Sequence, residues 1–410
     1  MNEKESNLIV KKEGLAKFFL YKLDDNAIPS KSMNVFYNKK MIINRDITSL
    51  AIKAYSELYD QDLIIVDSMA ASGISSIRLL VECNNVKKIY INDINPISID
   101  LINKNLLLNN LDLEFKDQIH VSKKDANFLL SELAQKKMNT SNSAIAKKPS
   151  VISIDPFGTP NKFINSAFRA IQREKGMICI TATDTAVLFG IKPKACIRKY
   201  MSKTLHVEYC KEIGARILIH FISRMANINK MGIIPLLTFY SNHFIRIFAL
   251  TIKNQKQISD SFKNYGYILH CTNCNYRIKK NDNILEFNQF CPICNDNTNM
   301  TYAGPLWIGK IHDFDFLKKI LLLNNNMNFA NKKKIGKILQ YCLDELNMPL
   351  SYYNIHKLSQ KLKLSHVPKM EEVLNLIKDK GFEASRTHFD YTAIKTNMNL
   401  SELKKILLIN

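Results

Sequence analysis

The sequence has no long hydrophobic run. No segment approaches the roughly 18 consecutive apolar residues that a membrane-spanning helix needs. The opening segment, MNEKESNLIVKKEG, is polar and charged where a secretory signal would be apolar. We therefore expect a cytoplasmic protein, and since disulfides are rare in that compartment, we expect its nine cysteines to be unpaired.

Negative charge is scarce. The 37 Asp and Glu residues stand against 58 Lys and Arg residues, which gives a formal net charge of +21. Such an excess favours a polyanionic partner, because Lys and Arg release condensed counterions when they bind phosphate groups. The alternative is a general compositional bias toward Lys, Ile and Asn, which would raise the charge without any such partner.

Short apolar runs alternate with helix-like stretches between residues 63 and 252, a pattern typical of a parallel α/β sheet. The expected strands are Leu63–Val66, Lys88–Ile91, Val151–Ile154, Gly176–Thr181 and Phe244–Ile252. The expected helices are Ile74–Val81, Ile97–Asn109, Ala126–Leu133, Phe163–Arg173 and Glu208–Met225. We interpret the polar segment 136–150 as a loop inserted before a strand.

The composition changes near residues 254–260, so we predict two domains, residues 1–254 and 255–410. The second domain carries two Cys-x2-Cys pairs, formed by Cys271, Cys274, Cys291 and Cys294. This spacing is typical of a four-thiolate Zn²⁺ site, which has no open coordination position. We therefore predict a structural zinc ion in a ribbon-like module over residues 268–297.

Acidic residues recur where expected strands give way to helices. Asp67 and Gly73 bracket the first such turn, Asp93 ends the second strand, and Asp125 with Ala126 begins a later helix. The first turn has one glycine rather than G-x-G-x-x-G, which argues against a dinucleotide. Each aspartate alone is more simply explained as a helix N-cap. Together they favour a nucleoside cofactor without phosphates, namely S-adenosylmethionine, whose ribose a strand-end carboxylate can bind.

The strongest chemical signal is VISIDPFGTP, an apolar strand followed by Asp155-Pro156-Phe157. The amine of guanine N2 is a poor nucleophile because its lone pair is delocalised into the ring. A carboxylate that accepts its N–H groups would orient it for attack on a methyl group. Pro156 stiffens the turn, and Phe157 offers a face on which a base can stack. Alone, this turn would be structural; downstream of the three acids, we interpret it as catalytic.

These residues resemble the tRNA guanine-26 N2-dimethyltransferase family. The resemblance covers residues 35 to 396, nearly the whole chain, and includes VFYNKKMIINRD, ASGISSIR, NDINP, DPFGTP, TATDTAVLFG, GPLWIGKIHD and ASRTHFDYTAIKT. It implies a class I, Rossmann-like methyltransferase domain followed by a smaller α+β domain, with tRNA as the partner. The residues that it places at the cofactor are Arg45, Arg78, Asp93, Asp125 and Ala126, with Asp155 as the catalytic acid. Ser75 stands where the family usually has an arginine.

Two further segments are candidates for substrate contacts. In TATD, Thr181 and Asp184 follow a strand and are expected to line the guanine pocket. In ASRTHFDYTAIKT, Arg386 and His388 stand among aromatic residues, a mixture that can bind a phosphate backbone and stack on bases. The alternative for His388 is a hydrogen-bonded structural role, since methyl transfer to an amine needs no histidine.

The sequence leaves other functions open. The same chemistry could act on another RNA guanine or on adenine N6, or on an amine in DNA. A protein that binds RNA without catalysis could also keep a methyltransferase fold. The intact Asp155-Pro156-Phe157 turn argues against that last reading.

Overall fold

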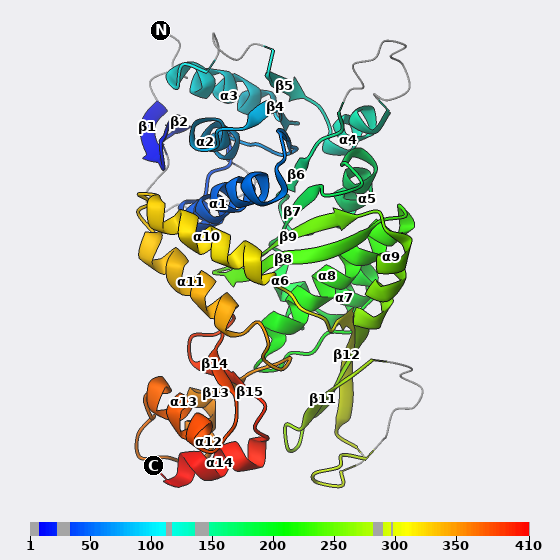
Figure 1. Ribbon diagram of the computed structural model, residues 1–410, viewed down its shortest axis with the longest axis vertical. Helices are drawn as coiled ribbons and strands as arrows, with labels where there is room; N and C mark the ends of the chain where they lie inside the picture. Colours follow the sequence, from blue (N-terminus) through cyan, green and yellow to red (C-terminus); the bar gives the residue numbers. More distant parts are fainter. Residues whose placement is uncertain are drawn as a thin grey trace.

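A seven-stranded sheet forms the centre of the N-terminal half of the molecule (Figure 1). The computed structural model describes residues 8–22, 33–111, 117–135, 147–281, 290–296 and 298–409. The strand order is β5-β4-β3-β6-β7-β9-β8. The strands are β3 (Leu63–Asp67), β4 (Val86–Asp93), β5 (Ile119–Lys123), β6 (Val151–Ile154), β7 (Met177–Ala182), β8 (Gly232–Ser241) and β9 (Phe244–Ile252). β9 runs antiparallel to both of its neighbours, whereas the five strands from β5 to β7 pair in parallel.

Two helical layers cover the two faces of this sheet. Side chains alternate between the faces, so that Leu63 and Ile65 of β3 belong to one hydrophobic cluster and Val66 belongs to the other. The helices of the N-terminal half are α1 (Ile42–Tyr59), α2 (Ile74–Glu82), α3 (Pro96–Leu108), α4 (Ala126–Gln135), α5 (Asn161–Ala170), α6 (Thr185–Leu188), α7 (Pro193–Tyr200) and α8 (Cys210–Ile228). Burial on both faces explains why the strands are almost continuously apolar.

The predicted strands and helices of this half are all present. The sequence reading omitted β5, β8, α1, α6, α7 and a hairpin of β1 (Leu8–Glu13) and β2 (Ala16–Tyr21). Of the predicted loop at 136–150, residues 136–146 lie outside the described residues. None of the described helices is both long and apolar enough to cross a membrane.

The C-terminal part consists of three pieces. A short helix, α9 (Gln255–Ser261), leads into an antiparallel ribbon of β10 (Tyr265–Cys271), β11 (Arg277–Lys280) and β12 (Met300–Trp307). Two helices follow, α10 (Phe314–Asn326) and α11 (Lys332–Asp344). The last piece contains β13 (Tyr353–Asn354), α12 (Ile355–Lys361), α13 (Met370–Asp379), β14 (Ala384–Arg386), β15 (Ala393–Thr396) and α14 (Leu400–Ile409).

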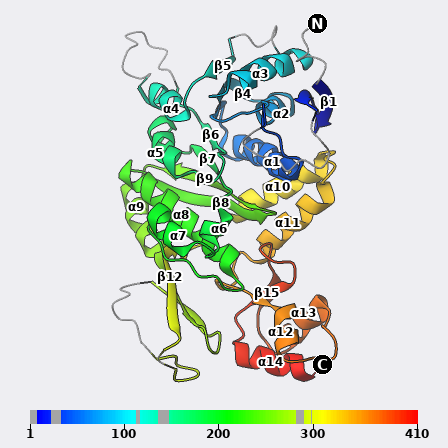
Figure 2. The ribbon, with the colours of Figure 1, turned by 180° about the vertical axis from the view of Figure 1, so that it is seen from behind.

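These pieces relate differently to the N-terminal half. Phe316 and Ile320 of α10 belong to the same hydrophobic cluster as Ile47 of α1, so α10 and α11 extend the N-terminal core. The terminal piece has a hydrophobic cluster of its own and lies beside the ribbon, at the opposite end of the molecule from β1 (Figures 1 and 2). The predicted boundary at 254–260 falls between β9 and the ribbon. It stays a prediction, because α10 and α11 follow it in the chain but pack into the core of the N-terminal half.

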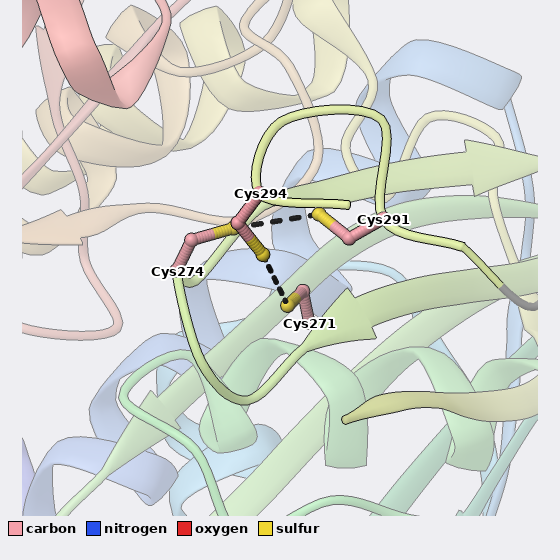
Figure 3. A group of neighbouring side chains, drawn as sticks. All are labelled: Cys271, Cys274, Cys291 and Cys294. Carbon is pink, nitrogen blue, oxygen red and sulfur yellow. Dashed lines mark hydrogen bonds between the residues drawn. The ribbon is translucent and has the colours of Figure 1, made fainter. Parts of the chain in front are cut away.

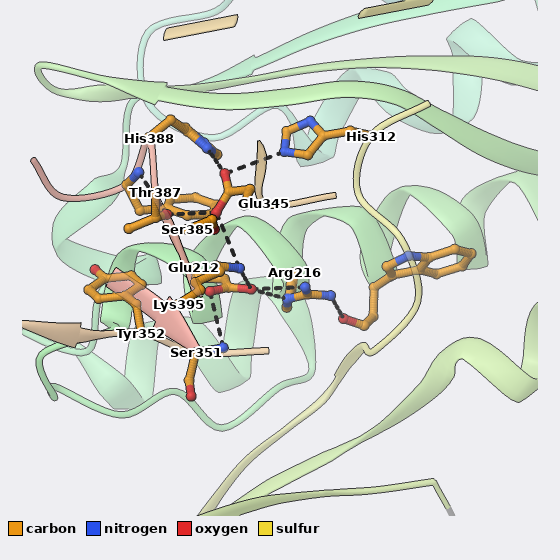
Figure 4. A network of polar contacts seen from close by, with 12 residues as sticks. Glu212, Arg216, His312, Glu345, Ser351, Tyr352, Ser385, Thr387, His388 and Lys395 are labelled. Carbon is orange, nitrogen blue, oxygen red and sulfur yellow. Dashed lines mark hydrogen bonds and ion pairs between the residues drawn. The ribbon is translucent and has the colours of Figure 1, made fainter. Parts of the chain in front are cut away.

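A buried network of charged groups joins the terminal piece to α8 (Figure 4). The ammonium group of Lys395 lies 2.9 Å from a carboxylate oxygen of Glu212 and 3.3 Å from one of Glu345. Glu212 also pairs with Arg216 at 2.8 Å, and His388 contacts Glu345. Two carboxylates thus face two permanent cations. Burial opposes ionisation of Glu345, but Lys395 and the histidines outweigh it and hold its pKa well below the usual value.

Candidate active site

A cavity of about 430 Å³ lies at the edge of the sheet where the parallel strands end. In an open α/β sheet, ligands bind outside the carboxyl ends of the strands, at the point where the strand order reverses. Here that point lies between β3 and β6, which are paired neighbours. The predicted site residues that line the cavity are Arg45, Asp93, Asp125, Ala126, Asp155, Pro156 and Phe157.

One side of the cavity is formed by the turn between β3 and α2. Gly73 has φ +76°, and a Cβ added there would lie 2.9 Å from the Ile102 side chain. Only glycine fits this position without strain. Asp93, at the end of β4, accepts hydrogen bonds from the backbone N–H groups of Ala71 (2.8 Å) and Asn95 (2.9 Å). The turn and the carboxylate are therefore held together before any ligand binds.

Asp125 is both an N-cap and a cavity residue. Its carboxylate accepts the backbone N–H of Asn127 at 2.9 Å, at the start of α4, and it also lines the cavity. Asp125 therefore has the N-cap role that we considered as the simpler explanation, and it also lies at the site.

Asp67 lies beneath the turn rather than in the cavity wall. Its carboxylate accepts a hydrogen bond of 2.7 Å from the Ser76 hydroxyl and is 6% exposed. Burial raises the pKa of Asp67 to about 6; Ser76 opposes this shift, and the nearby Asp155 and Asp93 carboxylates add to it. Asp93 and Asp155 are thus close enough to influence Asp67, but Asp67 itself lies behind the cavity wall.

The two predicted arginines are in different positions. Arg45 lines the cavity and forms an ion pair of 2.7 Å with Glu13 of β1. Arg78 is only 1% exposed and is absent from the cavity wall, because its guanidinium group pairs with Asp46 (2.6 Å) and Glu82 (2.9 Å). The implied contact of Arg78 with a cofactor does not fit this geometry, since its side chain is enclosed by acids on the other side of α2.

The Asp155 loop is fixed to the end of β7. The backbone N–H of Gly158 donates to the Thr183 hydroxyl (2.7 Å), and the N–H of Thr183 donates back to the Gly158 carbonyl (2.9 Å). Within the described part of the chain, no hydrogen bond is made to the Asp155 carboxylate. Phe157 is 47% exposed and meets Phe36 edge to face, with ring centroids 4.5 Å apart. The cavity therefore offers a carboxylate beside an accessible aromatic ring.

The predicted substrate residues lie outside this cavity. Thr181 is buried and accepts a hydrogen bond of 2.7 Å from Arg246. Asp184 pairs with Lys199 at 3.0 Å and accepts a bond of 2.8 Å from the Tyr200 hydroxyl, so both of its oxygens are occupied. Thr183, between them, is the residue of the TATD segment that reaches the wall.

Arg386 and His388 belong to the terminal piece. Arg386 donates to the Tyr391 carbonyl and lies over the Tyr341 ring. His388 is 3% exposed and contacts Glu345 in the buried network. For His388 the structure favours the hydrogen-bonded role over contact with RNA, because its ring has almost no accessible surface.

Several cavity residues were not singled out from the sequence, and four of them carry polar or aromatic side chains that the site could use. These are Phe36, Asn38, Lys162 and His243. Phe36 and Asn38 lie inside the VFYNKK motif, which could have pointed to them. His243 occupies the turn between β8 and β9, and no local pattern marks that turn.

The four paired cysteines converge at the tip of the ribbon (Figure 3). Their sulfur atoms all lie within 4.8 Å of one another, with 3.7 Å between Cys271 and Cys294 and 3.5 Å between Cys274 and Cys291. A tetrahedral Zn²⁺ with Zn–S bonds of about 2.3 Å requires S···S distances of about 3.8 Å. The donor set and its spacing fit such an ion.

Comparison with known proteins gives a consistent result. Residues 17–408 match the family model described as N2,N2-dimethylguanosine tRNA methyltransferase. The chain is 37% identical to the tRNA (guanine(26)-N(2))-dimethyltransferase of Methanosphaera stadtmanae, over 97% of this chain and 95% of that protein. It is 34% identical to the enzyme of the same name from Methanobrevibacter smithii, over 96% of both chains.

A solved structure shares the whole architecture. The complex of Trm1 from Pyrococcus horikoshii with S-adenosyl-L-methionine superposes with a TM-score of 0.80 at 29% identity, covering 97% of this chain and 99% of that one. The family match spans the sheet, the ribbon and the terminal piece alike. The chain therefore belongs to the N2,N2-dimethylguanosine tRNA methyltransferase family.

Proposed function

We propose that this protein transfers methyl groups from S-adenosylmethionine to the exocyclic N2 of guanine 26 in tRNA, giving N2-methylguanosine and N2,N2-dimethylguanosine. The observation that carries the proposal is the Asp155-Pro156-Phe157 turn, which lies in one cavity with the acids that end β4 and begin α4. Family membership supplies the target nucleoside and its position. The net charge of +21 suits a polyanionic substrate.

The cofactor side of the cavity is the wall made by the β3–α2 turn, Asp93 and Asp125. Asp93 keeps further acceptor capacity toward the cavity, which suits the hydroxyl groups of a ribose. The Ala70–Ser72 backbone lines the same wall without large side chains. When bound there, S-adenosylmethionine supplies an electrophilic sulfonium methyl group.

The base side of the cavity is the wall made by Asp155, Phe157 and Phe36. The half-exposed Phe157 ring gives the target guanine a surface to stack on once the base has left the helical stack of the tRNA. The Asp155 carboxylate accepts an N–H of the N2 amine, holds the nitrogen in line for attack and takes up the proton that the amine loses. Because no described residue occupies this carboxylate, it is available for that role.

The proposal is tested with two tRNA transcripts that differ at position 26. One carries guanosine and the other inosine, which keeps the rest of the guanine ring but lacks the N2 amine. We expect labelled methyl groups to enter the first transcript and not the second. Equal incorporation into both would show that another atom is methylated and would overturn the proposal.

We further propose that the four cysteines of the ribbon hold one structural Zn²⁺. The convergence of four sulfur atoms at tetrahedral spacing supports this. Elemental analysis of purified protein is expected to give one zinc per chain, falling to near zero in Cys291→Ser/Cys294→Ser. Cys83→Ser/Cys196→Ser, which changes two buried cysteines elsewhere, is the matched control and should keep its zinc.

A further inference from the structure

His243 is a cavity residue that the proposed reaction has not yet used. It lies in the turn between β8 and β9, and β9 pairs with β7 so that Ile245 is opposite Ala182. The turn therefore projects past the carboxyl end of β7, at the edge of the sheet where Asp155 follows β6. The side chain lines the same cavity as Asp155 and Phe157.

A neighbouring amide fixes the tautomer of His243. The Asn38 side-chain oxygen accepts the backbone N–H of Lys40 at 2.9 Å, which sets the orientation of the amide. The amide nitrogen then faces Nε2 of His243, at 3.4 Å. Since an NH₂ group only donates, Nε2 must be the acceptor, and the single proton of the neutral ring resides on Nδ1.

The ring is held in its neutral form. Burial and the nearby Lys40 lower the pKa of His243, and the Asp155 carboxylate only partly opposes them. Protonation would also place an N–H of the ring against the Asn38 amide. His243 is thus a fixed Nδ1–H donor, and within the described residues no acceptor is bonded to it.

We propose that His243 is a specificity-determining residue that donates its Nδ1–H to O6 of the target guanine. Guanine presents N–H donors at N1 and N2 and an acceptor at O6 along one edge. Asp155 is an acceptor and His243 is a donor in one cavity, which is the pattern that this edge requires. Adenine has an amine in place of O6, so the same donor would face a donor and be left unsatisfied. This inference rests on the proposed function, since it assigns a further contact to the same base.

Lys162 is a competing donor, since the other cavity cations, Arg45 and Lys124, are already paired with Glu13 and Glu132. It also lines the cavity, and an ammonium group could reach O6 in place of the imidazole. Lys162 does not share the fixed geometry that Asn38 gives to His243, because an ammonium group on a flexible stem sets no single direction.

The test removes the donor and its acceptor separately and together. Full-length tRNAs carry guanosine or 2-aminopurine at the methylated position; 2-aminopurine keeps the N2 amine but lacks O6 and the proton on N1. The catalytic efficiency kcat/KM is measured for the wild type, His243→Phe, His243→Asn and Lys162→Met. Asparagine keeps an N–H donor near the place of Nδ1, whereas phenylalanine keeps the ring shape without a donor. Thermal unfolding and cofactor affinity verify that each variant is folded.

We expect the wild type to prefer guanosine by at least about tenfold. In His243→Phe this preference should shrink several-fold, because guanosine loses a contact that 2-aminopurine never makes, while the share of the preference that comes from the N1 proton remains. His243→Asn and Lys162→Met should keep most of the preference. An equal loss on both substrates in His243→Phe would overturn the proposal, as would collapse of the preference in Lys162→Met instead. If the wild type fails to methylate guanosine at all, the proposed function itself is overturned and this inference with it.

Discussion

Charged side chains gather in two regions of the molecule, the buried network around Glu345 and the cavity around Asp155. The two regions differ in whether each carboxylate has a partner within the protein. In the buried network that joins the terminal piece to α8, Glu345 and Glu212 face Lys395 and Arg216, so the charges are compensated within the protein. In the cavity, the Asp155 carboxylate has no hydrogen-bond donor among the described residues. Compensated charges hold two parts of a chain in one arrangement, whereas an uncompensated carboxylate at an open wall is available to a ligand.

Four side chains in and beside the buried network can also be considered as a metal site. His312, Cys342, Glu345 and His388 offer ligand atoms within 4.8 Å of one another. The ammonium group of Lys395 already lies 3.3 Å from Glu345 and neutralises it. Among the described residues, no ion pair is made to the ribbon cysteines, and their four sulfur atoms fit a zinc ion better than the mixed cluster does.

The sharpest test of this comparison is the isosteric replacement of one acid from each region. Asp155→Asn is expected to lower the rate of methyl transfer by about 10³-fold, since a positioned acceptor of developing charge contributes that much. Cofactor affinity should stay within a few-fold and thermal stability should be almost unchanged. Rapid-quench kinetics and calorimetry on one preparation check both. Near-wild-type turnover in the variant would remove Asp155 from the chemistry.

Glu345→Gln is expected to lower stability and to leave the rate of methyl transfer almost unchanged. Removing one member of a buried, compensated network leaves Lys395 and the remaining groups short of a partner, at a cost of about 3 kcal/mol or more. Since the pKa of Glu345 is held well below its usual value, its stabilisation is present above about pH 4.5 and is lost as the pH falls below that point. Urea unfolding from pH 3.5 to 7 measures the loss. A variant as stable as the wild type at pH 7 would contradict the network's structural role.

Asp67 is the intermediate case, a buried acid whose charge Arg246 offsets only in part. Its folded-state pKa of about 6 exceeds the ordinary aspartate value of 3.8, so the unfolded chain releases the proton first as the pH rises. Stability should therefore fall between pH 4 and 6, by up to about 3 kcal/mol. Asp67→Asn should flatten this pH dependence and be the more stable protein at pH 7. Asp379→Asn, at an exposed carboxylate, is the control that should leave the pH dependence intact.

The smallest expected effect concerns the aromatic wall. Phe157→Leu should lower kcat/KM for tRNA by about tenfold, since stacking on one base contributes about 1–3 kcal/mol. Phe262→Leu, at a similarly exposed ring far along the chain, should leave it unchanged. Steady-state kinetics with varied tRNA provides the comparison, and equal effects in the two variants would mean that Phe157 has no particular contact with the base.

The sequence predicted the cavity better than it predicted the residues around it. The strand-end positions of Asp93 and Asp155 were visible because a parallel sheet brings the ends of its strands to one edge. Arg78 and His388 belong to equally distinctive motifs, yet their side chains are enclosed by Asp46, Glu82 and Glu345. A motif marks a constrained position, but it does not say whether the constraint is a ligand or a buried charge.

The parts that escaped prediction depend on contacts between distant segments. His243 reaches the cavity only because the hairpin of β8 and β9 is placed beside β7, and its tautomer depends on Asn38, some 205 positions away. The shared core of α1 and α10 likewise joins segments far apart in the chain, which a change of composition near residue 254 cannot reveal. Local periodicity carries no information on such pairings.

The most direct test of the account is mass spectrometry of the nucleosides from unmodified tRNA after incubation with the purified protein and S-adenosylmethionine. The account predicts N2-methylguanosine followed by N2,N2-dimethylguanosine, with neither product formed by Asp155→Asn on the same timescale. Absence of any methylated guanosine, in a sample shown to bind the cofactor, would contradict it and favour a protein that binds RNA without catalysis.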